Sequence, residues 1–202
     1  AIWLRDAAGE REVLPLADIR LPGWHNVENY MAALLAVDGL VRDETVRRVA
    51  REFAGVEHRI EFVRELHGVR YYNDSIATSP TRTIAGLRAF PHKVVLIAGG
   101  YDKHIPFAPL APEVVEHVKT LILCGATAEK IEAAVKSAPN YLNGQPEILH
   151  AQTLEEAVRL AKRHTVPGDI VTLSPACAAF DQFKNFMERG KTFKAIVNSW
   201  QE

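Results

Sequence analysis

The fold of this chain is decided by the segment Lys93-Val94-Val95-Leu96-Ile97-Ala98-Gly99-Gly100-Tyr101-Asp102-Lys103. Its apolar half runs without alternation, which is typical of a strand covered on both faces in a parallel sheet. The two glycines let the backbone turn sharply after that strand and leave room for a ligand. Ligands of open α/β sheets bind beyond the carboxyl ends of the strands. Asp102 and Lys103 therefore lie where binding is expected, although a charged pair in a loop is more often a solvated turn.

Outward from this strand, expected strands and helices alternate over the last two thirds of the chain. Strands are expected at 60–66, 69–72, 93–98, 120–124, 147–150 and 169–173, and the first two of them form a hairpin. The expected helices cover 79–90, 113–118, 127–137 and 153–164, and a last one begins near Phe180. This order predicts a doubly wound, Rossmann-like α/β domain with a mostly parallel sheet and an antiparallel edge.

The first 54 residues follow a different pattern. Residues 1 to about 22 read as a β-ribbon with a turn at 6–9, and 17–21 are expected to continue its second strand. Helices are expected over 24–37 and over 42–53, the second of them amphipathic. Gly55 ends the second helix. We therefore expect one domain in residues 1–54 and another in residues 55–202.

The composition argues against several classes of function. The 202 residues carry a formal net charge of −1 and no basic run, so we expect no nucleic acid partner. No apolar run approaches the ~20 residues of a membrane helix, so we expect no membrane partner. Cys124 and Cys177 form no CxxC motif, which leaves zinc and redox sites unsupported and fits a reducing cytoplasm. The sequence opens without Met inside an expected strand, and we expect a fragment of a longer protein.

One segment resembles a P-loop but does not match its full pattern. Gly190-Lys191-Thr192 resembles the end of a P-loop, but GxxxxGK[ST] needs glycine where the chain has Asn185. The GxGxxG fingerprint of dinucleotide-binding domains is absent as well. We expect the Gly-Lys-Thr segment on a helix surface, and the phosphates of any nucleotide to be bound elsewhere.

Four segments that follow expected strands should meet at one edge of the sheet: 74–78, 99–103, 125–127 and 174–180. Two of them carry an expected helix start, whose free N–H groups favour an anion by about 0.3–1 kcal/mol. Lys103 adds a positive charge. The segments therefore predict a small carboxylate held between Thr78, Lys103 and a helix start at Ala179-Phe180. Ser174 is interpreted as a turn residue rather than a nucleophile, because no His or Asp is placed by sequence to activate it.

These segments together resemble the Mur ligase family, and within it the ligases that add D-glutamate. The matching segments keep the family's order, and the last is followed by Arg189-Gly190: GWHNVEN at 23–29, HR at 58–59, NDSIAT at 73–78, GGYDK at 99–103 and LSPACAAFDQFKNF at 173–186. The last segment is highly specific, whereas the His-Asn-x-x-Asn and His-Arg pieces are shared with sister ligases.

The resemblance implies a monomeric, cytoplasmic, three-domain enzyme of peptidoglycan synthesis. Residues 1–54 would be the tail of its central ATP-binding domain, and residues 55–202 its C-terminal amino-acid-binding domain. ATP would convert the carboxylate of UDP-N-acetylmuramoyl-L-alanine into an acyl phosphate, which the amine of D-glutamate attacks. Magnesium and lysine charge would stabilise the transferred phosphoryl group. The resemblance places the magnesium ligands and the catalytic residues outside this chain.

The resemblance also implies a role for particular residues. On the nucleotide it places Asn26, Asn29, Arg59 and Asp74, the last of them on the ribose. On D-glutamate it places Thr78 and Lys103 at the α-carboxylate, and Ala179, Phe180 and Phe186 around the side-chain carboxylate. Spacing alone also allows Asn26 to be an N-cap and Asn29 a surface residue.

Two positions depart from the commonest family pattern. Ile76 stands where Lys is frequent, and Ala179 stands where a Ser hydroxyl usually helps to hold the side-chain carboxylate. A hydrogen bond to a charged group contributes about 1.5–3 kcal/mol. Backbone N–H groups near Ala179 are expected to bind the anion instead.

Other interpretations remain open at this stage. The chain could belong to a sister Mur-type ligase or to a folylpolyglutamate-type ligase, or be a stand-alone, non-catalytic ligand-binding module. Lys103 could be a solvated loop residue, and Phe183 and Phe186 could be core. His25 could be an orienting or a packed residue. Asp102 could orient Lys103 or approach the nucleotide.

Overall fold

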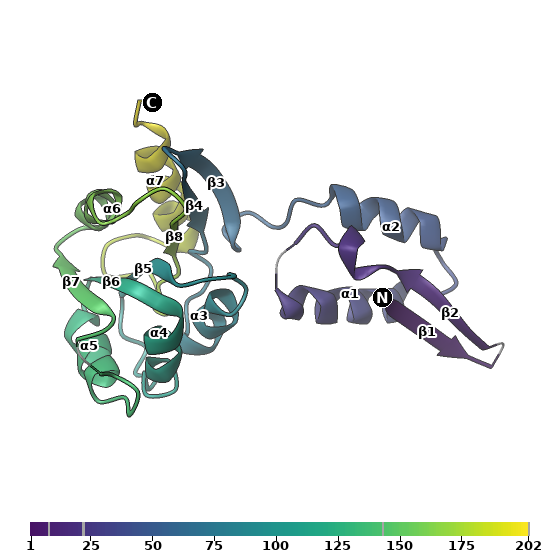
Figure 1. Ribbon diagram of the computed structural model, residues 1–202, viewed down its shortest axis with the longest axis horizontal. Helices are drawn as coiled ribbons and strands as arrows, with labels where there is room; N and C mark the ends of the chain where they lie inside the picture. The colour runs from purple at the N-terminus through teal and green to yellow at the C-terminus, as the bar shows by residue number, and fades with distance from the viewer. Residues whose placement is uncertain (8, 22, 143, 202) are drawn as a thin grey trace. The chain divides into compact units, whose positions relative to one another are not determined.

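A computed structural model of the chain describes residues 1–7, 9–21, 23–142 and 144–201. Ala8 of the expected turn and Pro22 at the end of the expected ribbon lie outside these described residues. The described chain divides into two compact units, Ala1–Gly55 and Val56–Glu202 (Figure 1). Each unit has its own hydrophobic core.

The first unit contains the expected ribbon and two helices. Strands β1 (Ile2–Asp6) and β2 (Gly9–Leu14) pair antiparallel, and helices α1 (Trp24–Val37) and α2 (Asp43–Glu52) follow. Its core consists of Ile2, Val13, Leu14, Leu34 and Ala50. The expected continuation of the second strand over 17–21 is wrong. A short 3-10 helix, η1 (Leu16–Asp18), stands there, because Pro15 has no N–H to donate to the strand ladder and ends β2.

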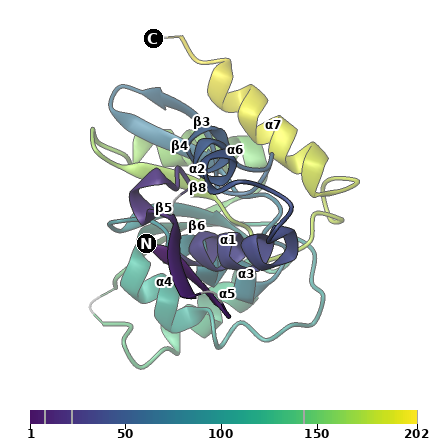
Figure 2. The same cartoon turned by 90° about the vertical axis from the view of Figure 1, so that its right-hand side faces the viewer.

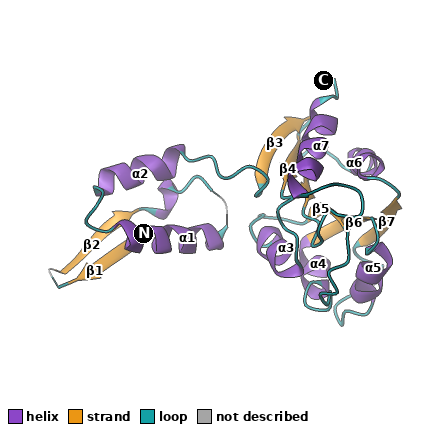
Figure 3. Cartoon of the chain, turned by 180° about the vertical axis from the view of Figure 1, so that it is seen from behind, coloured by secondary structure: helices purple, strands orange, loops and turns teal. Residues whose placement is uncertain are grey.

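The second unit is built on a six-stranded sheet in the order β3-β4-β8-β5-β6-β7, whose strands are labelled in Figure 1 and drawn in orange in Figure 3. The strands are β3 (Glu61–Leu66), β4 (Val69–Asn73), β5 (Val94–Ala98), β6 (Val118–Cys124), β7 (Glu147–Ala151) and β8 (Ile170–Leu173). Strand β3 runs antiparallel to β4, and the other pairs are parallel. The predicted doubly wound sheet with an antiparallel edge is confirmed.

Helices cover both faces of this sheet. Helices α3 (Pro80–Leu87), α4 (Ala111–His117) and α5 (Ala128–Lys136) pack on one face, and α6 (Leu154–Arg163) and α7 (Phe186–Asn198) on the other (Figures 1 and 2). Val94, Leu96 and Ala98 of β5 enter the first core, while Val95 and Ile97 enter the second. Two-sided burial explains why the sequence of β5 shows no alternation. Within the described part of the chain, no helix is long and apolar enough to cross a bilayer.

The last helix begins later than expected. It starts at Phe186 rather than near Phe180, because Asn185 is its N-cap. The Asn185 side chain accepts a hydrogen bond from the Glu188 N–H at 2.9 Å, and the Glu188 carboxylate accepts one from the Lys184 N–H at 3.1 Å. Ala179 opens only a single turn, in which the Phe183 N–H donates to its carbonyl at 2.8 Å. The expected helix start at Ala179-Phe180 is therefore wrong.

The glycines after β5 allow close approach of neighbouring backbone. Gly99 has φ +112°, and a Cβ there would lie 1.9 Å from the Cys124 carbonyl oxygen. Gly100 has φ +142°, and its Cβ would lie 2.4 Å from the carbonyl oxygen of Ala178. Both positions combine a backbone conformation that favours glycine with space for a hydrogen atom only. The room at this turn is thus filled by protein backbone.

We expect Gly99→Ala to destabilise the 202-residue chain by about 3 kcal/mol or more, since overpacking and left-handed strain add. Gly168→Ala is the matched control, because Gly168 has φ +97° and a Cβ there would meet nothing within 4 Å. It should lose only about 1–2 kcal/mol. Urea unfolding measures both, and equal losses would show that backbone strain alone accounts for Gly99.

Candidate functional site

The loops after β4, β8 and β5 meet at the carboxyl edge of the sheet. The Asp74 N–H donates to the Leu173 carbonyl at 2.8 Å, and the Gly99 N–H to the Pro175 carbonyl at 2.9 Å. The Tyr101 N–H donates to the Ala178 carbonyl at 2.9 Å. The loop after β6 joins them, because the Thr127 hydroxyl bonds both to the N–H and to the carbonyl of Gly100. The expectation that the four segments share one edge is confirmed.

Lys103 is exposed at this edge and carries an available charge. Among the described residues it has no hydrogen-bond or ion-pair partner. Its neighbour Asp102 accepts the His104 N–H at 2.7 Å and forms an ion pair with Lys130. The Lys130 hydrogen bond, followed by that of the His104 N–H, lowers the pKa of Asp102. Asp102 therefore does not orient Lys103, which can receive an anion.

The other residues expected on D-glutamate lie on the same loops. Thr78 is half-buried in the loop after β4, and Ala179 is buried in the loop after β8. Phe180 is 64% exposed and packs edge-to-face on Tyr101, with ring centroids 5.9 Å apart. Phe186, at the start of α7, is half-buried and packs edge-to-face on His58, with ring centroids 5.8 Å apart. Phe183 packs against the core of the α6 and α7 face, which confirms its interpretation as a packing residue.

Asp74 is a buried carboxylate. It is 4% exposed, and it accepts the Ile60 N–H at 3.3 Å and the Ser174 hydroxyl at 2.7 Å. Burial raises the pKa of Asp74 to about 7, against the opposing effects of these two hydrogen bonds and of the Arg59 charge. Arg59 itself is exposed, one residue before the Ile60 that Asp74 holds. The structure therefore brings the Arg59 segment and Asp74 together.

Ser174 lies in a polar network that the sequence did not indicate. Its hydroxyl donates to the Asp74 carboxylate at 2.7 Å and also contacts the Thr83 hydroxyl at 3.1 Å, so the fold places an Asp beside it that the sequence pattern did not. The two residues are separated by 100 positions, which hides the contact from any local pattern. Ser174 is 1% exposed, and its hydroxyl is hydrogen-bonded within the protein. Its role is structural, in agreement with its interpretation as a turn residue.

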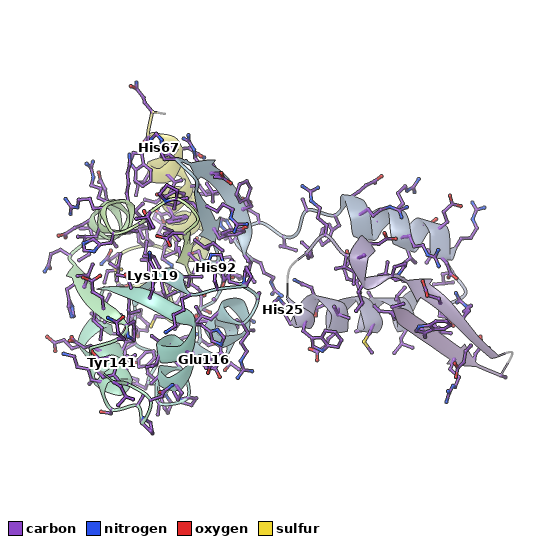
Figure 4. The ribbon with its side chains drawn as sticks, in the orientation of Figure 1. His25, His67, His92, Glu116, Lys119 and Tyr141 are labelled. Atoms are coloured by element: carbon purple, nitrogen blue, oxygen red, sulfur yellow. The ribbon has the colours of Figure 1, made fainter. Side chains whose placement is uncertain are left out.

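Asn26 and Asn29 belong to the first unit. Helix α1 is capped by Gly23, so the interpretation of Asn26 as an N-cap is wrong. The Asn29 amide donates to the Asn26 side-chain oxygen at 3.4 Å, which makes them a polar pair on one face of the helix. Asn26 is 8% exposed and Asn29 is exposed. His25, at the start of the same helix, is half-buried (Figure 4).

Glu57, His58 and Glu61 form a cluster whose side-chain ligand atoms lie within 4.8 Å of one another. Lys194 already pairs with both of its carboxylates, with its ammonium 2.7 Å from Glu57 and 2.8 Å from Glu61. Burial lowers the pKa of His58, and Nδ1 of its ring contacts the Asn73 amide at 2.9 Å. The cluster is therefore an ion-pair network in which an ammonium already bridges the two carboxylates.

The Gly190-Lys191-Thr192 segment, which resembles the end of a P-loop, lies within α7, so it is helical as expected. Lys191 is exposed, but Gly190 is buried against His58. Arg189, just before it, is a residue whose role the sequence did not reveal. It is 4% exposed and bonds to the loops after β4 and β8. The sequence offered one indication of its importance, since Arg189 lies between the matching 173–186 segment and the core residue Phe193.

The sequence matches the family described as "Mur ligase, glutamate ligase domain" over residues 58–177, which is more than half of the chain. Among curated relatives, the UDP-N-acetylmuramoylalanine–D-glutamate ligase of Clostridium beijerinckii is 57% identical over 190 residues. That alignment covers 94% of this chain and 42% of the relative. The chain thus spans about two fifths of the length of the curated relatives it matches.

Solved structures share the fold at low sequence identity. The UDP-N-acetylmuramate–alanine ligase of Thermotoga maritima matches with a TM-score of 0.66 and 16% identity, covering 90% of this chain and 39% of that one. FolC of E. coli, solved in complex with ADP, matches with a TM-score of 0.62 and 21% identity, covering 96% and 43%. At such identities the likeness shows the fold alone.

Asp74 should make the stability of the chain fall as the pH rises. Its folded pKa of about 7 lies above the ordinary value of 3.8. Between about pH 4 and pH 7 the folded chain therefore keeps a proton that the unfolded chain has lost. The free energy of unfolding should decline by up to about 1.4 kcal/mol per pH unit across this window and level off above it. Asp74→Asn should remove this decline.

Urea unfolding of both proteins between about pH 5 and pH 8 measures the effect as a difference in slope. Asp102→Asn is the control, since the pKa of Asp102 is lowered and its titration lies below this window. The assignment fails if the parent chain and Asp74→Asn show the same dependence on pH between pH 5 and pH 7.

Proposed function

The chain belongs to the Mur ligase family, whose glutamate ligase domain it contains, and on that premise we propose that it is the C-terminal part of an ATP-dependent ligase. The ligase would join D-glutamate to UDP-N-acetylmuramoyl-L-alanine in peptidoglycan synthesis. The observation that carries this proposal is the 57% identity to a ligase named for that reaction. We further propose a monomeric enzyme of the cytoplasm.

The two compact units are assigned to two different domains of the ligase. We assign residues 1–54 to the tail of the central ATP-binding domain and residues 55–202 to the amino-acid-binding domain. The division of the chain after Gly55 supports this boundary, as does a family match that lies wholly in the second unit. The phosphate cradle, the catalytic residues and the magnesium ligands are assigned to the part of the ligase outside this sequence.

The α-carboxylate of D-glutamate would bind Lys103 and Thr78. Lys103 offers an exposed ammonium group without a described partner, and Thr78 offers a half-buried hydroxyl on the adjoining loop. A unit charge about 4 Å from a carboxylate contributes about 1–4 kcal/mol between bulk water and a protein surface. This charge pair would hold the amino acid while its amine attacks the acyl phosphate.

The side-chain carboxylate of D-glutamate would bind near Ala179, Phe180 and Phe186. Ala179 has no hydroxyl to offer, so the backbone N–H groups of its turn would supply the hydrogen bonds. The exposed ring of Phe180 and the half-buried ring of Phe186 would exclude water from one side of the anion. Exclusion of water strengthens hydrogen bonds to a charged group.

On the nucleotide side we assign Asn26, Asn29, Arg59 and Asp74. The buried Asp74 carboxylate also holds the Arg59 segment through the Ile60 N–H. ATP as the nucleotide is proposed from the membership of the chain in the Mur ligase family. Bound magnesium would supply charge neutralisation to the transferred phosphoryl group. A folylpolyglutamate-type activity has weaker support, because the likeness to those enzymes lies in the fold alone.

We expect the ligase that contains this chain to release phosphate from ATP only when UDP-N-acetylmuramoyl-L-alanine and D-glutamate are both present. Lys103→Ala should raise the KM for D-glutamate about tenfold or more, because it removes the charge opposite the α-carboxylate. A coupled phosphate-release assay measures both effects.

Lys136→Ala is the matched control, an exposed lysine paired with Glu132 on α5. It should leave the KM for D-glutamate unchanged. Equal turnover with L-lysine or meso-diaminopimelate would refute D-glutamate as the substrate, and parental kinetics of Lys103→Ala would make Lys103 a solvated loop residue.

A further inference from the structure

We propose that Arg189 is a positioning residue for the side-chain carboxylate of D-glutamate. It would fix the backbone N–H of Ala179 toward the anion and place a buried positive charge behind it. This inference rests on the proposed function. It explains how a loop with Ala179 in place of a serine can hold a carboxylate.

The guanidinium of Arg189 joins two loops of the carboxyl edge. Nε donates to the Ser75 hydroxyl at 3.0 Å, and Nη2 donates to the Ser75 carbonyl at 3.0 Å. Nη1 donates to the Ala178 carbonyl at 3.1 Å, and Nη2 also donates to the Cys177 carbonyl at 3.0 Å. Removal of Arg189 would leave buried carbonyl oxygens on both loops without their donor.

The bonds to Ala178 determine where the next N–H points. The Ala178 carbonyl accepts both from Arg189 and from the Tyr101 N–H at 2.9 Å. In a trans peptide the carbonyl and the following N–H point in opposite directions. The Ala179 N–H is thereby directed away from Arg189, and it donates to no acceptor among the described residues. Donation to the carbonyl also polarises the peptide, which makes this N–H a stronger donor to an anion.

Arg189 brings its charge without a bonded counter-ion. Its four acceptors are one hydroxyl and three carbonyl oxygens, and within the described ranges no carboxylate forms an ion pair with it. Asp181 acts on it only by longer-range attraction. Burial lowers the pKa of Arg189 to about 10, so the side chain is charged at neutral pH. A buried cation whose hydrogen bonds go only to neutral acceptors favours an anion bound close by.

The same residue ties this pocket to the start of α7. The Ser75 hydroxyl accepts from Arg189 and donates to the Phe186 carbonyl at 2.8 Å. One guanidinium therefore holds the Ala178-Ala179 turn against the start of α7, and both would lie at the side-chain carboxylate of the substrate.

The test compares two amino acids on variants of the ligase that contains this chain. D-glutamate is measured by its KM, and D-glutamine, which lacks the side-chain charge, by its inhibition constant against D-glutamate. Arg189→Gln should raise the KM for D-glutamate about tenfold or more and the inhibition constant of D-glutamine about twofold at most. The KM for ATP should stay within about twofold. Arg189→Lys, which keeps the charge, should recover part of the loss.

Arg159→Gln is the matched control, since this exposed arginine pairs with Glu155 at the surface of α6, and it should change neither constant. Ser75→Ala is the second variant should Arg189→Gln fail to fold, and it should raise the KM for D-glutamate with the KM for ATP unchanged. Equal weakening of D-glutamate and D-glutamine, or no weakening of either, would overturn the positioning role. A parent enzyme that does not respond to D-glutamate would instead refute the proposed function.

Discussion

Two-sided burial of β5 is the constraint on which the second unit depends. All five of its side chains are buried, alternately in the α3–α5 core and in the α6–α7 core. A strand of this kind needs helices on both faces, and parallel neighbours need crossover connections that supply them. The chain must then leave the sheet at one edge, where Gly99 and Gly100 pass against the backbone of the neighbouring loops. The apolar core thus determines where the polar loops gather.

Those loops are held mainly by hydrogen bonds to buried polar side chains. Asp74, Ser174 and Thr83 form one network, and Arg189 with Ser75 forms another. Such groups are costly to bury alone, and each network stabilises the loops only when its members are all present. This gives the edge a fixed shape before any ligand arrives. Preorganised donors need little reorganisation when an anion binds.

Local sequence patterns predicted most of the helices and strands, and they failed at one helix start and where distant contacts decide. Continuous apolarity predicted β5 and the doubly wound sheet, and a short turn predicted the hairpin of β3 and β4. The start of α7 was missed because the N-cap at Asn185 outweighs the helical signal of the preceding residues. Asp74 and Ser174 lie 100 positions apart, so nothing local indicated their hydrogen bond. The strand pattern and the family motif both placed Lys103, whereas the contacts of Arg189 became visible only in the structure.

The corrected start of α7 changes how an anion can be bound at this edge. A helix N-terminus would have supplied several aligned N–H groups at Ala179-Phe180, but a single turn supplies few and carries little dipole. A turn without a serine hydroxyl needs another source of positive potential, and a buried guanidinium behind the peptide provides a full charge rather than a partial one. Its hydrogen bonds go to neutral acceptors, so the loop gains attraction for a carboxylate without exposing a cation that solvent would screen.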